Sequence, residues 1–303
     1  MGKLGAVDDL DQVLTRLAVA LGEVTAGPTA LAGGITNRNY RVRFGERDCV
    51  VRLPGKDTSL LGISRQAERI ATQAAAELGL SPRLVAADER SLVTEYVEAP
   101  IGDATSVRAA PEPIAQTLRR FHDSGAELPI RFWVPDLLDA YAGVVHDRGG
   151  RLPGAYRAAH ELAHRIGRAL PLSRPVPCHN DLLPANVLHV RDRGIMLVDW
   201  EYAGMGHRMF DVANLAAGAG LDEREESRLL AAYVEREPSR ADHAALRLMR
   251  IMSDAREAAW GVAQRWISDL DFDFAAYADR HFTRIAAAAS DPRLQEWLDA
   301  AAA

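Results

Sequence analysis

Residues 178–201 read CHNDLLPANVLHVRDRGIMLVDWE, and this stretch decides the fold. Two apolar runs, Asn186–Val190 and Ile195–Asp199, are joined by a polar turn that ends in glycine, a pattern typical of a β-hairpin. If the turn is centred on residues 192–193, Asn186 faces Asp199 across the ribbon. Directly opposed residues of an antiparallel pair project from the same face with Cβ atoms about 4.5–5.5 Å apart. The pattern therefore predicts that an amide and a carboxylate lie side by side.

Oxygen ligands on this ribbon predict a magnesium site. Mg²⁺ prefers oxygen atoms and usually binds through one or two protein groups together with substrate phosphates. Asn186 and Asp199 supply two such groups, and Asp181 lies on the loop that enters the hairpin. This layout suits phosphoryl transfer, in which one carboxylate faces the attacking hydroxyl and a metal neutralises phosphate charge. A structural hairpin with ordinary turn acids is the alternative, but the full spacing H-x-D-x-x-x-x-N with an opposed acid favours the functional interpretation.

Four residues, His179, Asp181, Asn186 and Asp199, resemble the catalytic loop and metal-binding acid of the protein-kinase-like superfamily. The form is that of aminoglycoside phosphotransferases and choline/ethanolamine kinases. The resemblance implies that Asp181 is the catalytic base, that Asn186 and Asp199 bind Mg²⁺, and that ATP is the co-substrate. It implies a structural role for His179. Asp211 resembles the downstream aspartate that braces the catalytic loop of this family, which is again a structural role.

The surrounding sequence predicts a small β lobe followed by a larger helical lobe, and the resemblance makes this an α+β, protein-kinase-like bilobal fold. We place the first lobe, with an antiparallel sheet, at residues 1–97 and the second at 98–303. Period-two and turn signals predict strands at 39–44, 49–53, 83–87 and 91–96. Helical spacing predicts helices at 7–21, 63–78, 113–124, 135–146 and 155–169, and further helices from residue 210 to the end.

A glycine-rich segment, LAGGITNRNY at residues 31–40, is the candidate phosphate-binding turn. Glycines permit close backbone approach, and successive backbone N–H groups donate to phosphate oxygens. A tight turn without a ligand is the alternative for a Gly-Gly pair alone. The basic residue on the strand that follows favours the nucleotide interpretation. The nucleotide-binding candidates of this segment are Gly33, Gly34, Thr36 and Asn37.

Arg52 stands in the otherwise apolar run Cys49–Leu53, where a charge is costly unless it meets a partner or a ligand. The resemblance implies that Arg52 holds phosphates and pairs with Glu68 on the next helix; an arginine on an edge strand in solvent is the alternative. The segment TEYV at residues 94–97 resembles the hinge between kinase lobes. The contacts implied there are main-chain contacts to adenine at Glu95 and Val97.

The residues of the candidate acceptor site carry the most specific implication of the resemblance about the substrate. Tyr202, Trp260 and Tyr277 match the aromatic box that encloses the cationic head group in choline/ethanolamine kinases. Aromatic faces suit a trimethylammonium group, at about 0.5–2 kcal/mol each. Glu257 stands where the family often has a second tryptophan, and its charge favours a less methylated amine such as ethanolamine. Core packing is the alternative for each aromatic residue.

Composition limits the other functions open to this chain. Its 303 residues carry a net charge of −6 and show no basic stripe, so we expect no nucleic-acid partner. No run approaches the roughly 18–20 apolar residues of a membrane span. With two cysteines and no apolar signal segment near residue 1, we expect a cytoplasmic protein.

The sequence thus predicts a kinase that uses ATP and Mg²⁺ to phosphorylate a small cationic alcohol, with choline or ethanolamine foremost. Another small-alcohol kinase, of the aminoglycoside or homoserine type, is the first alternative. A nucleotide-binding pseudokinase that acts as a scaffold is the second. The sequence does not decide between a monomer and a homodimer.

Overall fold

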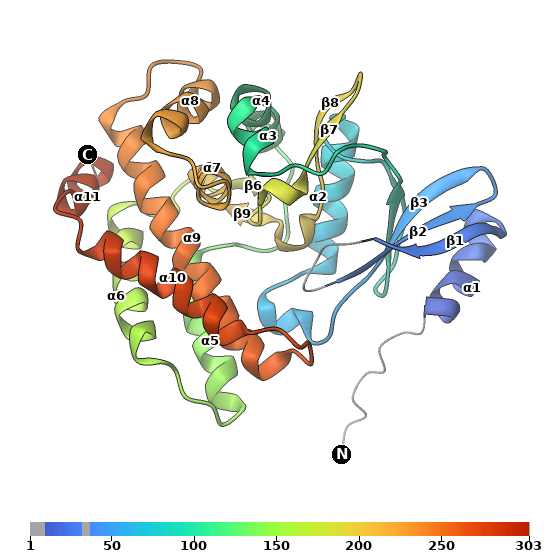
Figure 1. The fold of residues 1–303 in the computed structure, drawn as a ribbon, viewed down its shortest axis with the longest axis horizontal. Coiled ribbons are helices and arrows are strands. Elements are labelled where there is room, and N and C mark those ends of the chain that lie inside the picture. The colour runs from blue at the N-terminus through green and yellow to red at the C-terminus, as the bar shows by residue number, and fades with distance from the viewer. Residues whose placement is uncertain (1–9, 32–36, 303) are drawn as a thin grey trace.

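A computed structural model describes residues 10–31 and 37–302 of the chain. A five-stranded antiparallel sheet forms one end of the molecule, and helices form the rest (Figure 1). The strand order is β1-β2-β3-β5-β4. The strands are β1 (Val24–Ala30), β2 (Arg38–Phe44), β3 (Arg47–Leu53), β4 (Leu84–Ala87) and β5 (Leu92–Glu95). The predicted strands at this end of the chain are therefore confirmed, with β1 added ahead of them.

The two faces of this sheet contact different parts of the molecule, because side chains alternate between the faces along a strand. On β3, Cys49, Val51 and Leu53 are buried beneath helix α1 (Leu10–Leu21). The intervening residues Val50 and Arg52 point to the opposite face and line a cavity. Since β3 lies between β2 and β5, Arg52 is on a central strand and not on an edge exposed to solvent.

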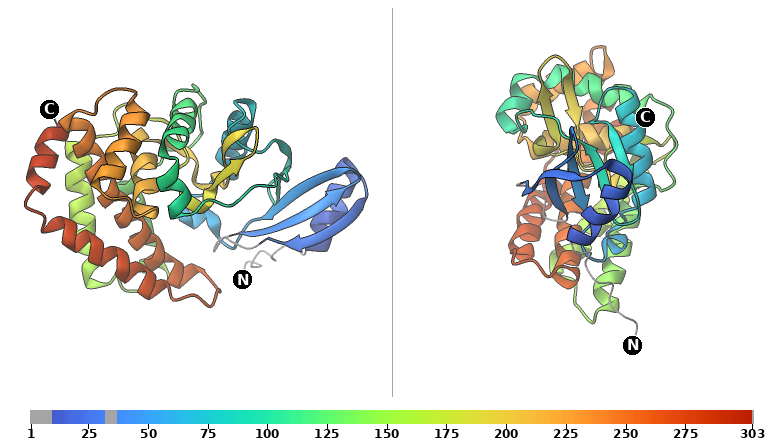
Figure 2. Two further views of the ribbon diagram at one scale, coloured as in Figure 1. Left: turned by 45° about the horizontal axis from the view of Figure 1, so that its top comes forward. Right: turned by 90° about the vertical axis from the view of Figure 1, so that its right-hand side faces the viewer.

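Helices make up most of the chain beyond the sheet, and they form the larger lobe (Figure 2). The long helix α9 (Arg240–Ile267) is its centre, with neighbours on several sides. The other helices are α2 (Arg65–Glu77), α3 (Ala104–Ala109), α4 (Pro111–His122), α5 (Val134–Asp147), α6 (Gly154–Ala169), α7 (Arg208–Gly218), α8 (Glu223–Val234), α10 (Phe274–Ala289) and α11 (Leu294–Ala302). The bilobal α+β class is confirmed. None of the helices among residues 10–31 and 37–302 combines the length and apolarity that crossing a bilayer needs.

The described part of the chain has two hydrophobic cores, and the elements that form each core are not consecutive in the sequence. One lies between α1 and the sheet, and the other fills the helical lobe. Ala71 and Ala75 of α2 belong to the second core, although α2 precedes β4 and β5 in the chain. The helix is thus packed against the large lobe and stands between it and the sheet (Figure 2). The lobe boundary after residue 97 stays a prediction; it falls between the end of β5 and the start of α3.

The hairpin at the centre of the sequence argument forms, but its register differs from the predicted one. Its strands are β7 (Val187–Val190) and β8 (Gly194–Leu197), and Val187 pairs with Leu197. Asn186 belongs to a 3₁₀ turn ahead of β7, and its carbonyl accepts from Val198 N at 3.0 Å. Asn186 therefore does not oppose Asp199 directly. The prediction was wrong by one residue because the polar turn is centred on residue 192.

Short pieces near the hairpin complete the frame of the site. Strand β6 (Val176–Cys178) precedes the hairpin in the sequence and β9 (Gly204–Gly206) follows it, and these two strands pair with each other. The segment that connects the two lobes crosses the hairpin, where Gly102 N donates to Val187 O at 2.8 Å. A side chain at Gly102 would collide with the backbone carbonyl of Pro184. The chain between the lobes is thus bound directly to the hairpin.

Candidate active site

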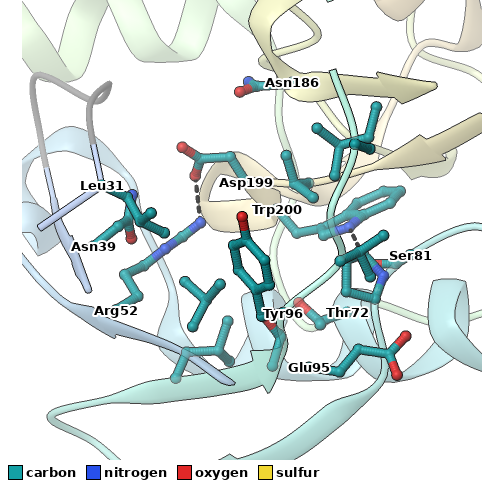
Figure 3. Close-up of a pocket in the computed structure, with 18 of the residues that line it drawn as sticks. Leu31, Asn39, Arg52, Thr72, Ser81, Glu95, Tyr96, Asn186, Asp199 and Trp200 are labelled. Atoms are coloured by element: carbon teal, nitrogen blue, oxygen red, sulfur yellow. Dashed lines mark hydrogen bonds and ion pairs between the residues drawn. The ribbon is translucent and has the colours of Figure 1, made fainter. Parts of the chain in front are cut away.

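The end of β8 turns sharply and brings Asp199 into a cavity between the lobes. Asp199 has a φ of 68°, in the left-handed region, so the chain leaves the strand geometry at this residue. This turn compensates for the shifted register, because both Asp199 and Asn186 line the same cavity of about 370 Å³. Figure 3 shows Asn186 above and Asp199 below it at one end of this cavity. The two oxygen-bearing residues therefore lie at one end of the same cavity by a backbone route that differs from the predicted one, and their binding of Mg²⁺ stays a prediction.

The rest of the cavity wall comes from the sheet, from the segment between the lobes and from the hairpin. Among the predicted nucleotide-binding residues, Arg52, Glu95 and Val97 line it. Gly33, Gly34 and Thr36 lie outside the described residues. Residues that the sequence argument did not single out also line it, namely Leu31, Asn39, Val50, Thr72, Ser81, Pro82, Leu92, Thr94, Tyr96, Ala99, Ile101, Ala185, Leu188, Val198 and Trp200.

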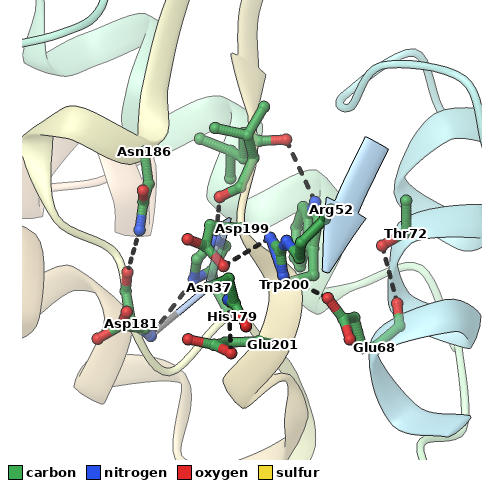
Figure 4. A network of polar contacts seen from close by, with 12 residues as sticks. Asn37, Arg52, Glu68, Thr72, His179, Asp181, Asn186, Asp199, Trp200 and Glu201 are labelled. Atoms are coloured by element: carbon green, nitrogen blue, oxygen red, sulfur yellow. Dashed lines mark hydrogen bonds and ion pairs between the residues drawn. The ribbon is translucent and has the colours of Figure 1, made fainter. Parts of the chain in front are cut away.

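Arg52 is the cation of this cavity. The residue is only 8% exposed, and its guanidinium bonds both Glu68 of α2 and Asp199, whose Oδ1 accepts from Nη2 at 2.6 Å. Burial alone would lower the pKa of Arg52, but the carboxylates of Asp199 and Glu68 raise it. The predicted pairing with Glu68 is confirmed, and Figure 4 shows Arg52 between the two acids.

A hard divalent cation fits the donor set at this end of the cavity. The side-chain Nδ2 of Asn186 donates to the carbonyl of Asp181 at 2.8 Å, which leaves the amide oxygen as the free acceptor. Asp199 uses Oδ1 for Arg52 and retains Oδ2. One amide oxygen and one carboxylate oxygen are the ligand chemistry that Mg²⁺ takes when phosphates complete its shell.

Glu201 is a further acid beside this centre that sequence reasoning did not single out. It is buried, and its Oε2 accepts from the side-chain amide of Asn37 at 2.8 Å. Burial, followed by the negative charge of Asp199, raises the pKa of Glu201 to about 8. Asn37, predicted to donate to phosphate, therefore has its amide nitrogen engaged by this acid (Figure 4).

Asp181 is positioned by its backbone and by a buried arginine. Its carbonyl holds Asn186, and its carboxylate Oδ1 accepts from Arg256 Nη1 at 3.0 Å. Burial raises the pKa of Asp181 to about 7, with contributions from the charges of Glu257 and Asp199, whereas the guanidinium of Arg256 opposes the rise. A carboxylate in this state exchanges a proton near neutral pH, which suits a general base.

The predicted acceptor residues form one cluster around Arg256. The guanidinium carbon of Arg256 lies 4.1 Å from the centre of the Tyr202 ring, a cation–π geometry. Arg256 also pairs with Glu257, and Tyr277 Oη donates to Glu257 Oε2 at 2.6 Å. Trp260 completes the cluster, because its Nε1 donates to Tyr202 Oη at 2.9 Å.

Arg256 is the functional candidate that the sequence argument missed. It is 2% exposed, and its Nε and Nη2 atoms have no hydrogen-bond partner among the described residues. The signal was present: an Arg-Glu pair stands in α9 between buried Ala255 and Ala258, where a charge needs partners. Spacing along one helix does not reveal that Asp181, from another part of the chain, is one of those partners.

His179 and Asp211 support the loop that carries Asp181. Both are fully buried, and the Asp211 carboxylate accepts from the backbone N–H groups of His179 and Asn180 at 2.7 Å each. His122 donates to the same carboxylate at 2.9 Å. Burial alone would raise the pKa of Asp211, but the contacts with His122 and His179 hold it below its usual value. His179 Nε2 also lies 2.9 Å from the carbonyl of Val198, so its ring joins the loop to the hairpin.

Replacing Asp211 with asparagine should destabilise the protein strongly. An amide has one acceptor oxygen instead of two, so its NH₂ group would face a backbone N–H that now donates to the carboxylate. One buried hydrogen bond would be lost and two donors would face each other. We expect the free energy of unfolding to fall by about 3–5 kcal/mol, measured by urea denaturation. The control is Asp123→Asn, which removes a surface ion pair with Arg208 and should cost less than about 1 kcal/mol. Equal losses in the two variants would contradict the supporting role.

Comparison with known proteins agrees with this geometry. The chain is 29% identical over 289 residues to ethanolamine kinase 2 of the mouse, Mus musculus, covering 83% of this chain and 73% of that protein. A solved choline/ethanolamine kinase family protein from Mesorhizobium loti has a TM-score of 0.81 and 28% identity, over 96% of this chain and 98% of that one. Choline kinase LicA from Streptococcus pneumoniae has a TM-score of 0.79 and 25% identity, over 92% and 98%. Residues 28–249 match the model of the phosphotransferase enzyme family, and the chain therefore belongs to that family.

Proposed function

We propose that this phosphotransferase moves the γ-phosphoryl group of ATP onto the hydroxyl of a small amino alcohol, with Mg²⁺ as the metal. The observation that carries the proposal is the position of Asp181. Its backbone holds Asn186 at the nucleotide cavity, while its carboxylate contacts Arg256 in the acceptor cluster. One residue thus stands between the two candidate binding sites.

The nucleotide side supplies binding and charge. Arg52 would bind phosphate oxygens, while Glu95 and Val97 border the opposite part of the cavity, where adenine would lie. Asn186 and Asp199 would hold Mg²⁺, which supplies charge neutralisation on the phosphates when bound. Glu68 keeps Arg52 in place, so that the guanidinium is oriented before the nucleotide arrives.

The acceptor side supplies the nucleophile. The substrate hydroxyl donates its proton to the Asp181 carboxylate while its oxygen forms a bond to the γ-phosphorus. The bond from that phosphorus to the β–γ bridging oxygen breaks, and ADP leaves with the electron pair. His179 and Asp211 do not touch the reactants; they hold the loop that carries Asp181.

Asp181→Asn should abolish turnover without preventing nucleotide binding, because an amide does not accept the hydroxyl proton. We expect kcat to fall by about 10²–10⁴, with the Kd for ATP, from calorimetry, changed by no more than a few-fold. Asp192→Asn is the matched control, since Asp192 is an exposed acid in the hairpin turn and should leave kcat unchanged. Near-normal turnover of Asp181→Asn would refute the assignment of the base.

Arg256→Met should move the pH profile of kcat/KM. The Arg256 guanidinium lowers the pKa of Asp181, and the carboxylate is the active form. Removing the guanidinium raises that pKa, so the acid limb should move to higher pH by about one unit or more. Activity should fall far more at acidic than at alkaline pH.

Arg256→Lys retains the charge and should restore most of the original profile. The melting temperature of each variant separates this effect from unfolding. A loss of the same size at every pH would show that Arg256 serves only packing.

Within the amino alcohols, we propose ethanolamine as the better acceptor and choline as the poorer one. The face of Tyr202 that would pack on a quaternary ammonium is already covered by Arg256. Glu257 offers a carboxylate with about four acceptor sites, of which Tyr277 uses one on Oε2 and Arg256 uses one on Oε1. A primary ammonium donates hydrogen bonds to such sites, whereas a trimethylammonium group has no N–H to donate.

A series of acceptors with none to three N-methyl groups tests this preference. We expect kcat/KM to fall at each methylation and to be about tenfold or more lower for choline than for ethanolamine, because a charged hydrogen bond contributes about 1.5–3 kcal/mol. Glu257→Gln, of nearly equal size, should bring the two values closer. A kcat/KM for choline equal to or above that for ethanolamine would overturn the proposal.

One observation favours a second acceptor class, an amino acid with a side-chain hydroxyl, as in a homoserine-type kinase. Arg256 has two buried donor nitrogens, Nε and Nη2, without a hydrogen-bond partner in the described part of the chain, and a substrate carboxylate would satisfy them. Adding homoserine and an aminoglycoside to the same panel decides between the classes. The aromatic cluster around Arg256 does not favour a bulky polyhydroxylated acceptor.

A further inference from the structure

A cluster of metal-binding side chains lies away from the nucleotide cavity and the acceptor cluster. Asp139 is on α5, and His160 and His164 are on α6. The two histidines are four residues apart, so their side chains lie on one face of the helix, one turn apart. Figure 1 shows α5 and α6 in the lower part of the helical lobe, with α6 farther from the sheet than α5, and the two helices are in contact. None of the three residues lines the nucleotide cavity.

The atoms of this cluster converge on a point. His160 Nε2 is 2.6 Å from Asp139 Oδ1, His164 Nε2 is 3.5 Å from Asp139 Oδ2, and the two Nε2 atoms are 3.2 Å apart. A tetrahedral zinc ion has Zn–N and Zn–O bonds of about 2.0–2.2 Å, which places its ligand atoms about 3.3 Å from one another. Two of the three measured separations already match that spacing.

Hydrogen bonds alone cannot make all three contacts of this cluster favourable. A neutral imidazole carries one N–H, so each Nε2 is either a donor or an acceptor. If both histidines donate to Asp139, two N–H groups face each other across 3.2 Å. If His164 donates to His160, the lone pair of His160 faces Asp139, and a carboxylate does not donate. At most two of the three contacts are favourable, whereas a cation between the atoms makes all three favourable.

We propose that Asp139, His160 and His164 bind a transition-metal ion of the Zn²⁺ class. Two imidazoles and one carboxylate favour zinc and its neighbours over Mg²⁺, which takes oxygen ligands. The side chains are 57%, 32% and 35% exposed for Asp139, His160 and His164, so an ion reaches them from solvent. Three protein ligands leave a fourth position for water. The site is separate from the Mg²⁺ site of the proposed function and does not rest on it.

A metal at this place would tie α5 to α6. Both helices pack against α9, which carries Arg256, Glu257 and Trp260. Already, Tyr156 of α6 donates its hydroxyl to the carbonyl of Leu138 on α5. Since a ligand that binds only the folded state stabilises it, zinc should raise the melting temperature through this helix pair.

The test is zinc binding to the chelator-treated chain without a polyhistidine tag. We expect one equivalent of Zn²⁺ to bind, with a rise in melting temperature that Mg²⁺ alone does not produce. His160→Ala and His164→Ala, tested separately, should each weaken zinc binding by about tenfold or more and remove the thermal shift. Both side chains are partly exposed, and circular dichroism without zinc verifies that each variant folds.

Two controls locate the metal. His146→Ala changes an exposed histidine of α5 outside the cluster and should bind zinc like the parent chain. Asn186→Ala removes a proposed Mg²⁺ ligand and should also leave zinc binding unchanged. Absence of stoichiometric zinc, or zinc binding that survives both His160→Ala and His164→Ala, would overturn the proposal. Loss of zinc binding in Asn186→Ala but not in His160→Ala would place the metal in the nucleotide cavity and overturn it equally.

Discussion

The buried guanidinium of Arg52 is the constraint on which the arrangement of this molecule depends. A charge removed from water must be paired, and Arg52 finds its two partners on two other parts of the chain. The arginine comes from the sheet, Glu68 from a helix that packs against the large lobe, and Asp199 from the end of the hairpin. The pairing therefore fixes the sheet relative to the catalytic hairpin. It also turns the cavity-facing side of β3 into the wall of a site, while the alternate residues of the same strand form the core beneath α1.

A second buried arginine, Arg256, has the same arrangement of acidic partners as Arg52. Each of the two arginines is almost fully buried, each bonds one glutamate, and each also bonds an aspartate at the site. The glutamate in each case offsets the charge of the arginine and orients it, and the aspartate is held by an already oriented cation. Such preorganised charge needs no rearrangement when the substrate arrives, which is the main source of catalytic stabilisation in dry sites. The two aspartates differ in what they do, because only Asp181 faces the acceptor cluster.

The sequence predicted the parts of this site that depend on local patterns. Two apolar runs around a glycine turn predicted the hairpin, and a lone charge in an apolar strand predicted that Arg52 needs a partner, which the family resemblance implied to be Glu68. The register was missed because the centre of the turn, where Asp192 is left-handed, is a local backbone choice that the hydrophobic pattern does not encode. Arg256 was missed because its partner Asp181 is 75 positions earlier. Likewise, the spacing of two histidines on α6 is visible in the sequence, but Asp139 joins them only through the packing of α5.

The binding of Asp199 to Arg52 bears on how a metal enters the nucleotide cavity. A carboxylate has two oxygens, and Arg52 occupies Oδ1, so the guanidinium fixes the plane in which Oδ2 lies. Without Arg52, the carboxylate of Asp199 would lose the contact that orients it, and the charges of Asp199 and Glu201 would repel each other; burial, followed by the charge of Asp199, already raises the pKa of Glu201. A divalent cation bound with phosphates would bring both positive and negative charge into this cavity. Under the proposed function, Arg52 would bind those phosphates in the orientation that Glu68 gives it, since the guanidinium carries five N–H donors and needs few of them for either acid. In that function, the same residue would serve as a structural link between the sheet and the hairpin and as a phosphate ligand.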